Sequence, residues 1–150
     1  MPRIETKIQI DAPADIVWNE LIDMSQYSEW NPFIEYEDGE TSKGEKLQLK
    51  IVQPSGMSFS IKPTVTENRE NQKFEWLGRL LMPGIFDGRH TFELAEENGT
   101  TTFRHYETFT GILKYPMGWF GVYRKTRPGF ELMNQKLKQR AEERFAASRA

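Results

Sequence analysis

Residues 86–111 read FDGRHTFELAEENGTTTFRHYETFTG and hold the clearest strand–turn–strand pattern in the chain. The pair Asn98-Gly99 is typical of a two-residue hairpin turn, because the central residues of such a turn need a positive φ. A turn at this pair places Glu93 opposite Arg104, and opposite charges favour each other across neighbouring strands. The segment therefore predicts a long antiparallel hairpin whose register follows from its turn.

The other face of this hairpin is aromatic and carries three polar side chains. In the same register His90 lies opposite Glu107, and His105 shares their face. Gly88 falls in mid-strand, as does Gly78 in the preceding strand, and glycine there marks sharp curvature or the close approach of another group. An apolar concave face with a few convergent polar groups is typical of a ligand pocket.

The rest of the chain is read from the spacing of its apolar residues, which is two in strands and three or four in helices. Further strands are expected at 3–11, 33–38, 46–53, 57–67 and 71–80. A short helix is expected after Asp11 and Pro13, and a second helical turn at 25–29. A long C-terminal helix is expected from about Met117, with Pro128 near its start or at a kink. Its apolar face holds Phe130, Met133, Leu137, Ala141 and Phe145.

This order of elements predicts an α+β roll. A curved seven-stranded antiparallel sheet has one face to bury, and the long C-terminal helix is the only element large enough to cover it. Two short helices follow the first strand. The 150 residues match the size of one domain, and we expect residues 1–150 to form it.

Composition excludes several classes of protein. The 20 basic and 22 acidic side chains give a net charge of −2, which argues against a nucleic-acid binder. The chain has no cysteine, which excludes disulfides, thiolate metal sites and thiol nucleophiles. No apolar run is long enough to span a membrane, and the N-terminus has no signal-peptide core, so a cytoplasmic protein is expected. Glycine motifs for nucleotide cofactors are absent, and we expect no cofactor.

Aromatic residues make up 13% of the chain although its mean hydropathy is −0.68, so they must fill a core or line a cavity. Rows of aromatic side chains are often simple core, and His90 with Glu107 could be a buried structural pair. The pair could also meet a ligand. The two histidines and the carboxylate are residue types that could hold a metal ion, but we expect no metal site. The expected pocket residues are Phe59, Ile61, Trp76, Gly78, Phe86, Gly88, His90, Phe92, Phe103, His105, Glu107, Phe109, Phe120, Phe130, Met133 and Leu137.

Several short motifs resemble a known superfamily when they are taken in order. They are Ala12-Pro13 with Val17-Trp18, Asp23, Trp30-Asn31-Pro32-Phe33, Trp76 with Gly78, Phe86-Asp87-Gly88 with His90 and Phe92, the strand from Phe103 to Gly111, Gly129-Phe130-Glu131, Met133-Asn134 and Leu137-Lys138. Together they resemble the START-like, helix-grip superfamily, and within it the bacterial polyketide cyclase/dehydrase-like proteins. The resemblance covers nearly the whole chain. It implies a helix-grip roll, in which a curved sheet wraps a long C-terminal helix with a deep hydrophobic cavity between them.

Members of this superfamily bind lipids, sterols, hormones or polyketides, and some catalyse cyclisation or dehydration. The first expectation is a carrier or sensor of a small hydrophobic molecule, acting as a monomer or homodimer. The alternative is an enzyme in which His90 or His105 is the base and Glu107 orients it or acts as an acid. The loop 81–85 and the pair Trp119-Phe120 would flank the entrance, or else form a dimer contact.

Overall fold

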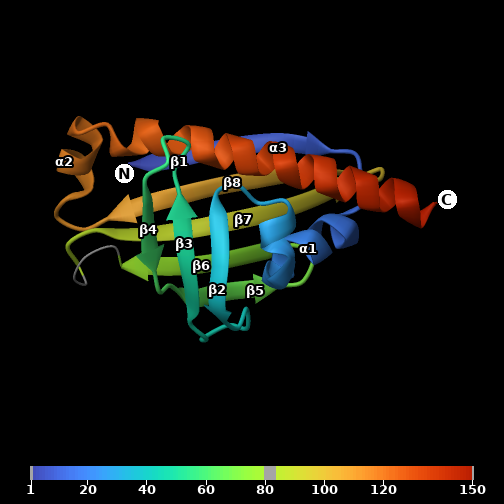
Figure 1. Cartoon of the computed structure of the whole chain (residues 1–150), viewed down its shortest axis with the longest axis horizontal. Helices are drawn as coiled ribbons and strands as arrows, with labels where there is room; N and C mark the ends of the chain where they lie inside the picture. Colours follow the sequence, from blue (N-terminus) through green and yellow to red (C-terminus); the bar gives the residue numbers. More distant parts are fainter. Residues whose placement is uncertain (1, 80–83, 150) are drawn as a thin grey trace.

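The computed structural model describes residues 2–79 and 84–149, and it has the predicted α+β architecture with antiparallel strands and a long C-terminal helix (Figure 1). The strands are β1 (Arg3–Ile10), β2 (Ile34–Gly39), β3 (Leu47–Val52), β4 (Ser58–Ile61), β5 (Thr64–Arg69), β6 (Lys73–Arg79), β7 (Asp87–Glu97) and β8 (Thr100–Thr110). The helices are α1 (Ala14–Ile22), a 3-10 helix (Met24–Glu29), α2 (Lys114–Trp119) and α3 (Val122–Ser148).

The larger sheet has the strand order β1-β8-β7-β6-β5. Its centre is the hairpin β7–β8, and the register predicted from Asn98-Gly99 is confirmed, since Glu93 pairs with Arg104 and His90 with Glu107. Asn98 and Gly99 both have a positive φ, as the turn requires. Strand β1 pairs with β8 along its whole length and forms one edge of this sheet.

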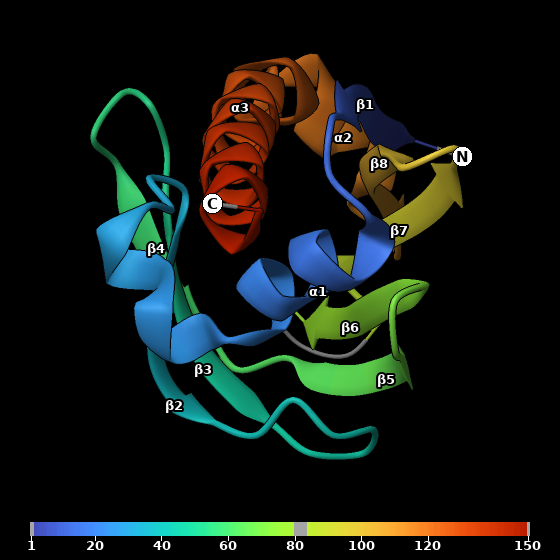
Figure 2. The same ribbon diagram turned by 90° about the vertical axis from the view of Figure 1, so that its right-hand side faces the viewer.

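The strand count differs from the prediction, because the expected strand 57–67 is two strands in two sheets. Strand β4 pairs with β3 in a smaller sheet of order β2-β3-β4, and β5 pairs with β6 in the larger one. The break falls at Lys62-Pro63, since proline has no N–H for the sheet ladder. Figure 2 shows α3 nearly end-on, with the strands curving around it from β1 to β4.

The C-terminal helical region also differs from the prediction of one helix beginning near Met117. Two helices are present, α2 and α3, and they are separated at Gly121, which has a φ of 77° in the left-handed region that favours glycine. Pro128 lies inside α3, in its second turn. The expected apolar face of α3 is buried at Phe130, Met133, Leu137 and Ala141.

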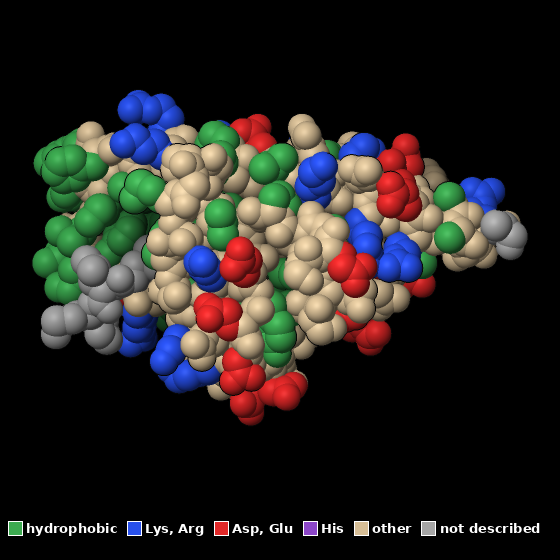
Figure 3. Space-filling view, viewed as in Figure 1, with side chains coloured by type: hydrophobic (Ala, Val, Ile, Leu, Met, Phe, Trp, Pro, Cys, Tyr) green, Lys and Arg blue, Asp and Glu red, His purple; other side chains and the backbone are tan. Residues whose placement is uncertain are grey.

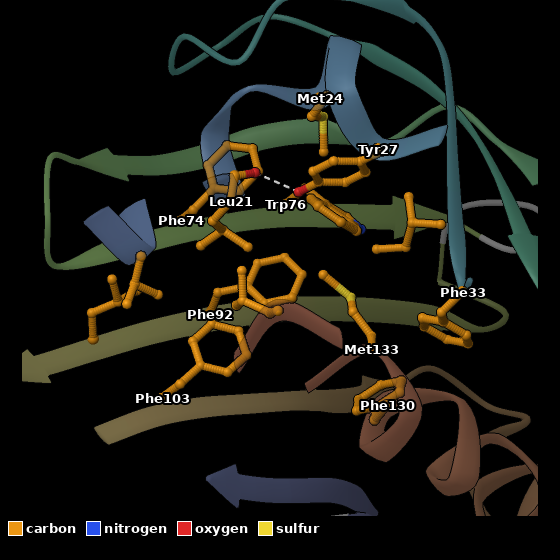
Figure 4. Packing of buried hydrophobic residues seen from close by; sticks show 14 of the residues in the cluster. Leu21, Met24, Tyr27, Phe33, Phe74, Trp76, Phe92, Phe103, Phe130 and Met133 are labelled. Carbon is orange, nitrogen blue, oxygen red and sulfur yellow. Dashed lines mark hydrogen bonds between the residues drawn. The ribbon is translucent and has the colours of Figure 1, made fainter. Parts of the chain in front are cut away.

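The core lies between the larger sheet, α1 and α3. Figure 4 shows Phe74, Phe92 and Phe103 on neighbouring strands, with Met133 and Phe130 of α3 facing the sheet. The rings of Phe92 and Phe103 stack with centroids 5.9 Å apart, and all of these side chains are fully buried. This part of the roll is therefore filled by side chains.

Candidate functional site

An inner cavity of about 80 Å³ lies between the two sheets and the first turns of α3. Its predicted lining residues are Phe59, Ile61, Trp76, Gly78, Phe86, His90, Glu107 and Phe109. The prediction missed Phe33, Ile51, Gln53, Val122 and Thr126, which also line it. The missed residues come from the smaller sheet and from α3, whose packing against the hairpin cannot be inferred from strand alternation.

An outer pocket of about 420 Å³ adjoins the inner cavity. The two share four lining residues, namely Gln53, Phe59, Val122 and Thr126, and the outer pocket adds apolar side chains such as Met57 and Phe120. The two spaces are therefore neighbours, with these four shared side chains between them, on one path from the surface to the sheet.

Exposed hydrophobic side chains surround the mouth of this path, at the end of the molecule where α2 lies (Figure 3). Trp119 is 83% exposed and Phe120 is 73% exposed, and of the two only Phe120 is among the lining residues of the outer pocket. Residues 81–83 of the loop predicted to flank the same entrance lie outside the described residues.

Other predicted pocket residues do not line the cavity. Phe92, Phe103, His105, Phe130, Met133 and Leu137 are fully buried in the packed core. Phe59 lines the cavity as expected, and it is 43% exposed because it lies on β4, at the mouth. Gly88 lies beneath the Glu107 carboxylate, which occupies the space that a side chain at Gly88 would need. The aromatic rows are thus mainly core, and the cavity is smaller than the resemblance implies.

His90 and Glu107 meet on the wall of the inner cavity. His90 Nδ1 lies 3.5 Å from Glu107 Oε1, and the His90 ring stacks on Trp76 with centroids 4.7 Å apart. His90 is buried, whereas the Glu107 side chain retains 14% exposure. The carboxylate is therefore the more accessible of these two polar groups on the wall.

A buried row of polar side chains continues from His90 into the core. His90 Nε2 lies 2.7 Å from His105 Nε2, and His105 Nδ1 lies 2.8 Å from Asn134 Oδ1 on α3. Asn134 Nδ2 donates to Thr6 Oγ1 on β1, and the Thr6 hydroxyl donates to the backbone oxygen of His105, both at 2.8 Å. The row joins the cavity wall to the C-terminal helix and to the first strand.

Thr6 and Asn134 were not predicted as site residues, although the sequence pattern around each one indicates a buried polar side chain. Thr6 has the inward parity of Ile4, Ile8 and Ile10 in the first strand, so a polar side chain was due to be buried there. Asn134 lies four residues after Phe130 on the buried side of α3. A polar residue at such a place needs a partner, and two buried histidines were candidates.

The distance between the two histidines has the geometry of a hydrogen bond. Two nitrogen ligands on one tetrahedral zinc ion lie about 3.3 Å apart, given metal–nitrogen distances near 2.05 Å. The observed 2.7 Å is shorter than that separation. Within residues 2–79 and 84–149, no group of three or more potential metal ligands is found.

Burial lowers the pKa of His105 well below its ordinary value, and the neighbouring His90 lowers it further, while the hydrogen bond with Asn134 raises it. An imidazolium in this core would be desolvated and would lie against another histidine. His105 is therefore neutral at pH 7, with one nitrogen carrying hydrogen and the other free to accept.

We expect acid to destabilise the protein through His105 below about pH 6.5, the ordinary histidine pKa. The unfolded chain takes up a proton there and the folded chain does not, so stability is present at higher pH and falls as the pH falls. One such group changes the free energy of unfolding by up to about 1.4 kcal/mol per pH unit. Urea unfolding at about pH 7.5 and about pH 5.5 measures this, and His105→Gln is expected to flatten the dependence. Equal stability of the unsubstituted protein at both values contradicts the prediction.

Comparisons with known proteins agree with this architecture. The family model described as "Polyketide cyclase / dehydrase and lipid transport" matches residues 1–142. No curated protein matches the chain in sequence. Among the described residues, no helix has the length and apolar character needed to cross a membrane.

Solved structures share the fold at low sequence identity. A protein from Mesorhizobium loti is 16% identical with a TM-score of 0.70, over 95% of this chain and 98% of that one. A protein from Thermus thermophilus is 15% identical with a TM-score of 0.71, over 95% and 99%. BexL, a di-domain ARO/CYC protein from the BE-7585A biosynthetic pathway, is 15% identical with a TM-score of 0.63, over 96% of this chain and 50% of that one. Identity at this level shows the fold alone.

Proposed function

Because the chain belongs to the polyketide cyclase / dehydrase and lipid transport family, we propose that its inner cavity and outer pocket bind one small hydrophobic molecule. The molecule enters past Phe120 and Met57 and places its polar end against Glu107. The chain acts as a carrier or sensor of this molecule.

The observation that carries this proposal is that the two spaces are adjacent. An isolated apolar cavity inside a core is a packing defect, but this one shares Val122 and Thr126 in its lining with a surface pocket of about 420 Å³. Its far wall bears a carboxylate, which a purely structural core avoids. Apolar surface buried by a ligand there contributes about 25 cal/mol per Å².

The proposal predicts that a large side chain placed where the inner cavity and the outer pocket meet weakens binding. Val122→Trp places a large ring where the inner cavity and outer pocket meet, and we expect it to weaken binding of the neutral dye N-phenyl-1-naphthylamine at least about tenfold. Leu132→Trp is the matched control, because Leu132 is an exposed residue of the same helix and lines neither space. Dye fluorescence measures the affinity, and circular dichroism and thermal unfolding check the fold of both variants.

Two outcomes of this experiment contradict the proposal. One is that the dye does not bind the unsubstituted protein. The other is that the Val122 and Leu132 variants bind it equally well, which would place the dye on the exposed surface around Trp119. Native mass spectra of the protein purified from cells add a second test, since a retained molecule appears as a reproducible extra mass.

The second candidate is an enzyme of the cyclase or dehydratase type. What favours it is the place of His90 and Glu107 on the cavity wall, where a proton could be taken from a carbon beside a carbonyl group or given to a leaving oxygen. His90→Gln and Glu107→Gln separate the candidates. A catalytic site loses turnover of a cyclisable substrate while the affinity persists, whereas a binding site loses affinity more strongly from a change at Trp76.

A further inference from the structure

The donor and the acceptor of each hydrogen bond in the buried polar row can be assigned, starting from Thr6. The backbone oxygen of His105 can only accept, so the Thr6 hydroxyl donates its one hydrogen to it. Thr6 Oγ1 must then accept from Asn134, which directs the amide nitrogen of Asn134 to Thr6 and its oxygen to His105. His105 Nδ1 therefore carries a hydrogen and donates it to Asn134.

The same logic fixes the protonation of His90. His105 is neutral with its hydrogen on Nδ1, so its Nε2 accepts, and the 2.7 Å contact requires His90 Nε2 to donate. Only Nδ1 of His90 is then free, and it faces Glu107 Oε1. Thr6, Asn134 and His105 thus act as positioning residues for His90.

A second polar group at the cavity is also left as an acceptor. The Thr126 hydroxyl donates to the backbone oxygen of Val122 at 2.7 Å and accepts from Gln53 Nε2 at 3.2 Å. Gln53 lines both the inner cavity and the outer pocket, and its buried Oε1 has no hydrogen-bond partner among the described residues. The orientation of this amide is therefore fixed, with its carbonyl oxygen unpaired.

The Glu107 side chain likewise receives no hydrogen bond from residues 2–79 and 84–149, and His90 lies beside it at 3.5 Å. Its Oε2 lies over Gly88, in space that any other residue would fill. The hydrogens of His90 Nε2 and the Thr126 hydroxyl are directed to other residues of the protein, as is one of the two hydrogens of Gln53 Nε2. What these side chains leave for a ligand is two oxygen acceptors and one amide hydrogen of Gln53.

We propose that the cavity selects a neutral molecule through a hydroxyl group, an alcohol or a phenol, that donates a hydrogen bond to Glu107. This inference rests on the proposed binding function and names the ligand class. A carboxylate ligand would meet the oxygens of Glu107 and Gln53 and would find one amide hydrogen of Gln53 as its donor among these groups. An ammonium ligand would lie beside His90 and would find Glu107 as the one carboxylate among the lining residues. A hydroxyl group can donate to Glu107 and accept from the Gln53 amide.

Four probes with one ring skeleton test this proposal: 2-naphthol, 2-methoxynaphthalene, 2-naphthoate and 2-naphthylmethylammonium. We expect 2-naphthol to bind at least about tenfold more tightly than 2-methoxynaphthalene, which can only accept, since a hydrogen bond to a charged group is a strong one. The two charged probes are expected to bind more weakly than 2-naphthol. Isothermal titration calorimetry on the full chain measures all four affinities.

Glu107→Leu should remove the preference for 2-naphthol and leave the affinity for 2-methoxynaphthalene unchanged. Glu93→Leu is the control, because Glu93 lies on the outer face of the same hairpin, where it pairs with Arg104. Thermal unfolding verifies that each variant folds. If 2-methoxynaphthalene binds the unsubstituted protein as tightly as 2-naphthol, or if a charged probe binds best, the hydroxyl proposal is overturned and the binding function stands. If no naphthalene probe binds, both are overturned.

Discussion

Gly129→Ala is expected to lower the free energy of unfolding by about 2 kcal/mol, because it adds a methyl group to a site that has no room for one. A Cβ atom at Gly129 would lie 2.5 Å from two ring carbons of Phe33. The ring cannot retreat easily, since it is buried and packs edge-on against Phe130 with centroids 5.4 Å apart (Figure 4). Alanine improves helix propensity by about 1 kcal/mol, so the measured loss is a net effect.

Thermal unfolding measures this prediction as a decrease in Tm of roughly 4–8 °C for a protein of this size. The double variant with Phe33→Leu provides the control, because a smaller side chain opposite position 129 gives the new methyl group space. The double variant should lose less stability than the sum of the two single changes. A Gly129→Ala protein as stable as the parent would show that β2 and α3 are not in close contact at this point.

Gly88→Ala is expected to remove the preference for a hydroxyl ligand while changing stability little. A methyl group at position 88 would overlap Oε2 of Glu107 and lie 3.1 Å from its Cδ. The end of a glutamate side chain is flexible, so it can rotate away at small cost, and the carboxylate then leaves both its place on the wall and its contact with His90. We expect affinity for 2-naphthol to fall at least about tenfold, to that of 2-methoxynaphthalene.

Gly78→Ala is the matched control for this change. Gly78 pairs directly with Gly88 and also lines the cavity, but the nearest atom to a Cβ there is the backbone oxygen of Gly88, at an ordinary contact distance of 3.8 Å. The alanine at position 78 should therefore leave the preference for 2-naphthol intact. If both glycine variants behave alike, the effect comes from lost cavity space and the assigned role of Glu107 is wrong.

The central hairpin could be predicted from sequence because one local signal determines its whole register. Once Asn98-Gly99 forms the turn, the pairing of His90 with Glu107 follows from counting. The order of elements and the long C-terminal helix follow from hydrophobic spacing in the same way. These features depend on residues close together in the chain, where propensity and periodicity decide the outcome.

The parts that were missed depend on packing between distant segments. The sequence shows Pro63 but does not show that the chain changes sheets there, and the change leaves Phe59 of β4 43% exposed. Gln53 and Thr126 come together only because β3 packs near the start of α3. Alternation also could not separate aromatic side chains that fill the core from those that line the cavity, since Phe92 and Phe109 lie on the same face of the hairpin.

The pairing of β1 with β8 has a consequence for the order in which the molecule assembles. Thr6 and the backbone of His105 are 99 positions apart, and Thr6 and Asn134 are 128 apart. During synthesis β1 leaves the ribosome long before β8 has been made, so β1 stays unpaired until then. Contacts of such long range also carry a high loop-closure cost and form slowly. The polar row behind Glu107 is therefore among the last parts of the protein to form, and a newly made chain holds its core hairpin before it can orient His90.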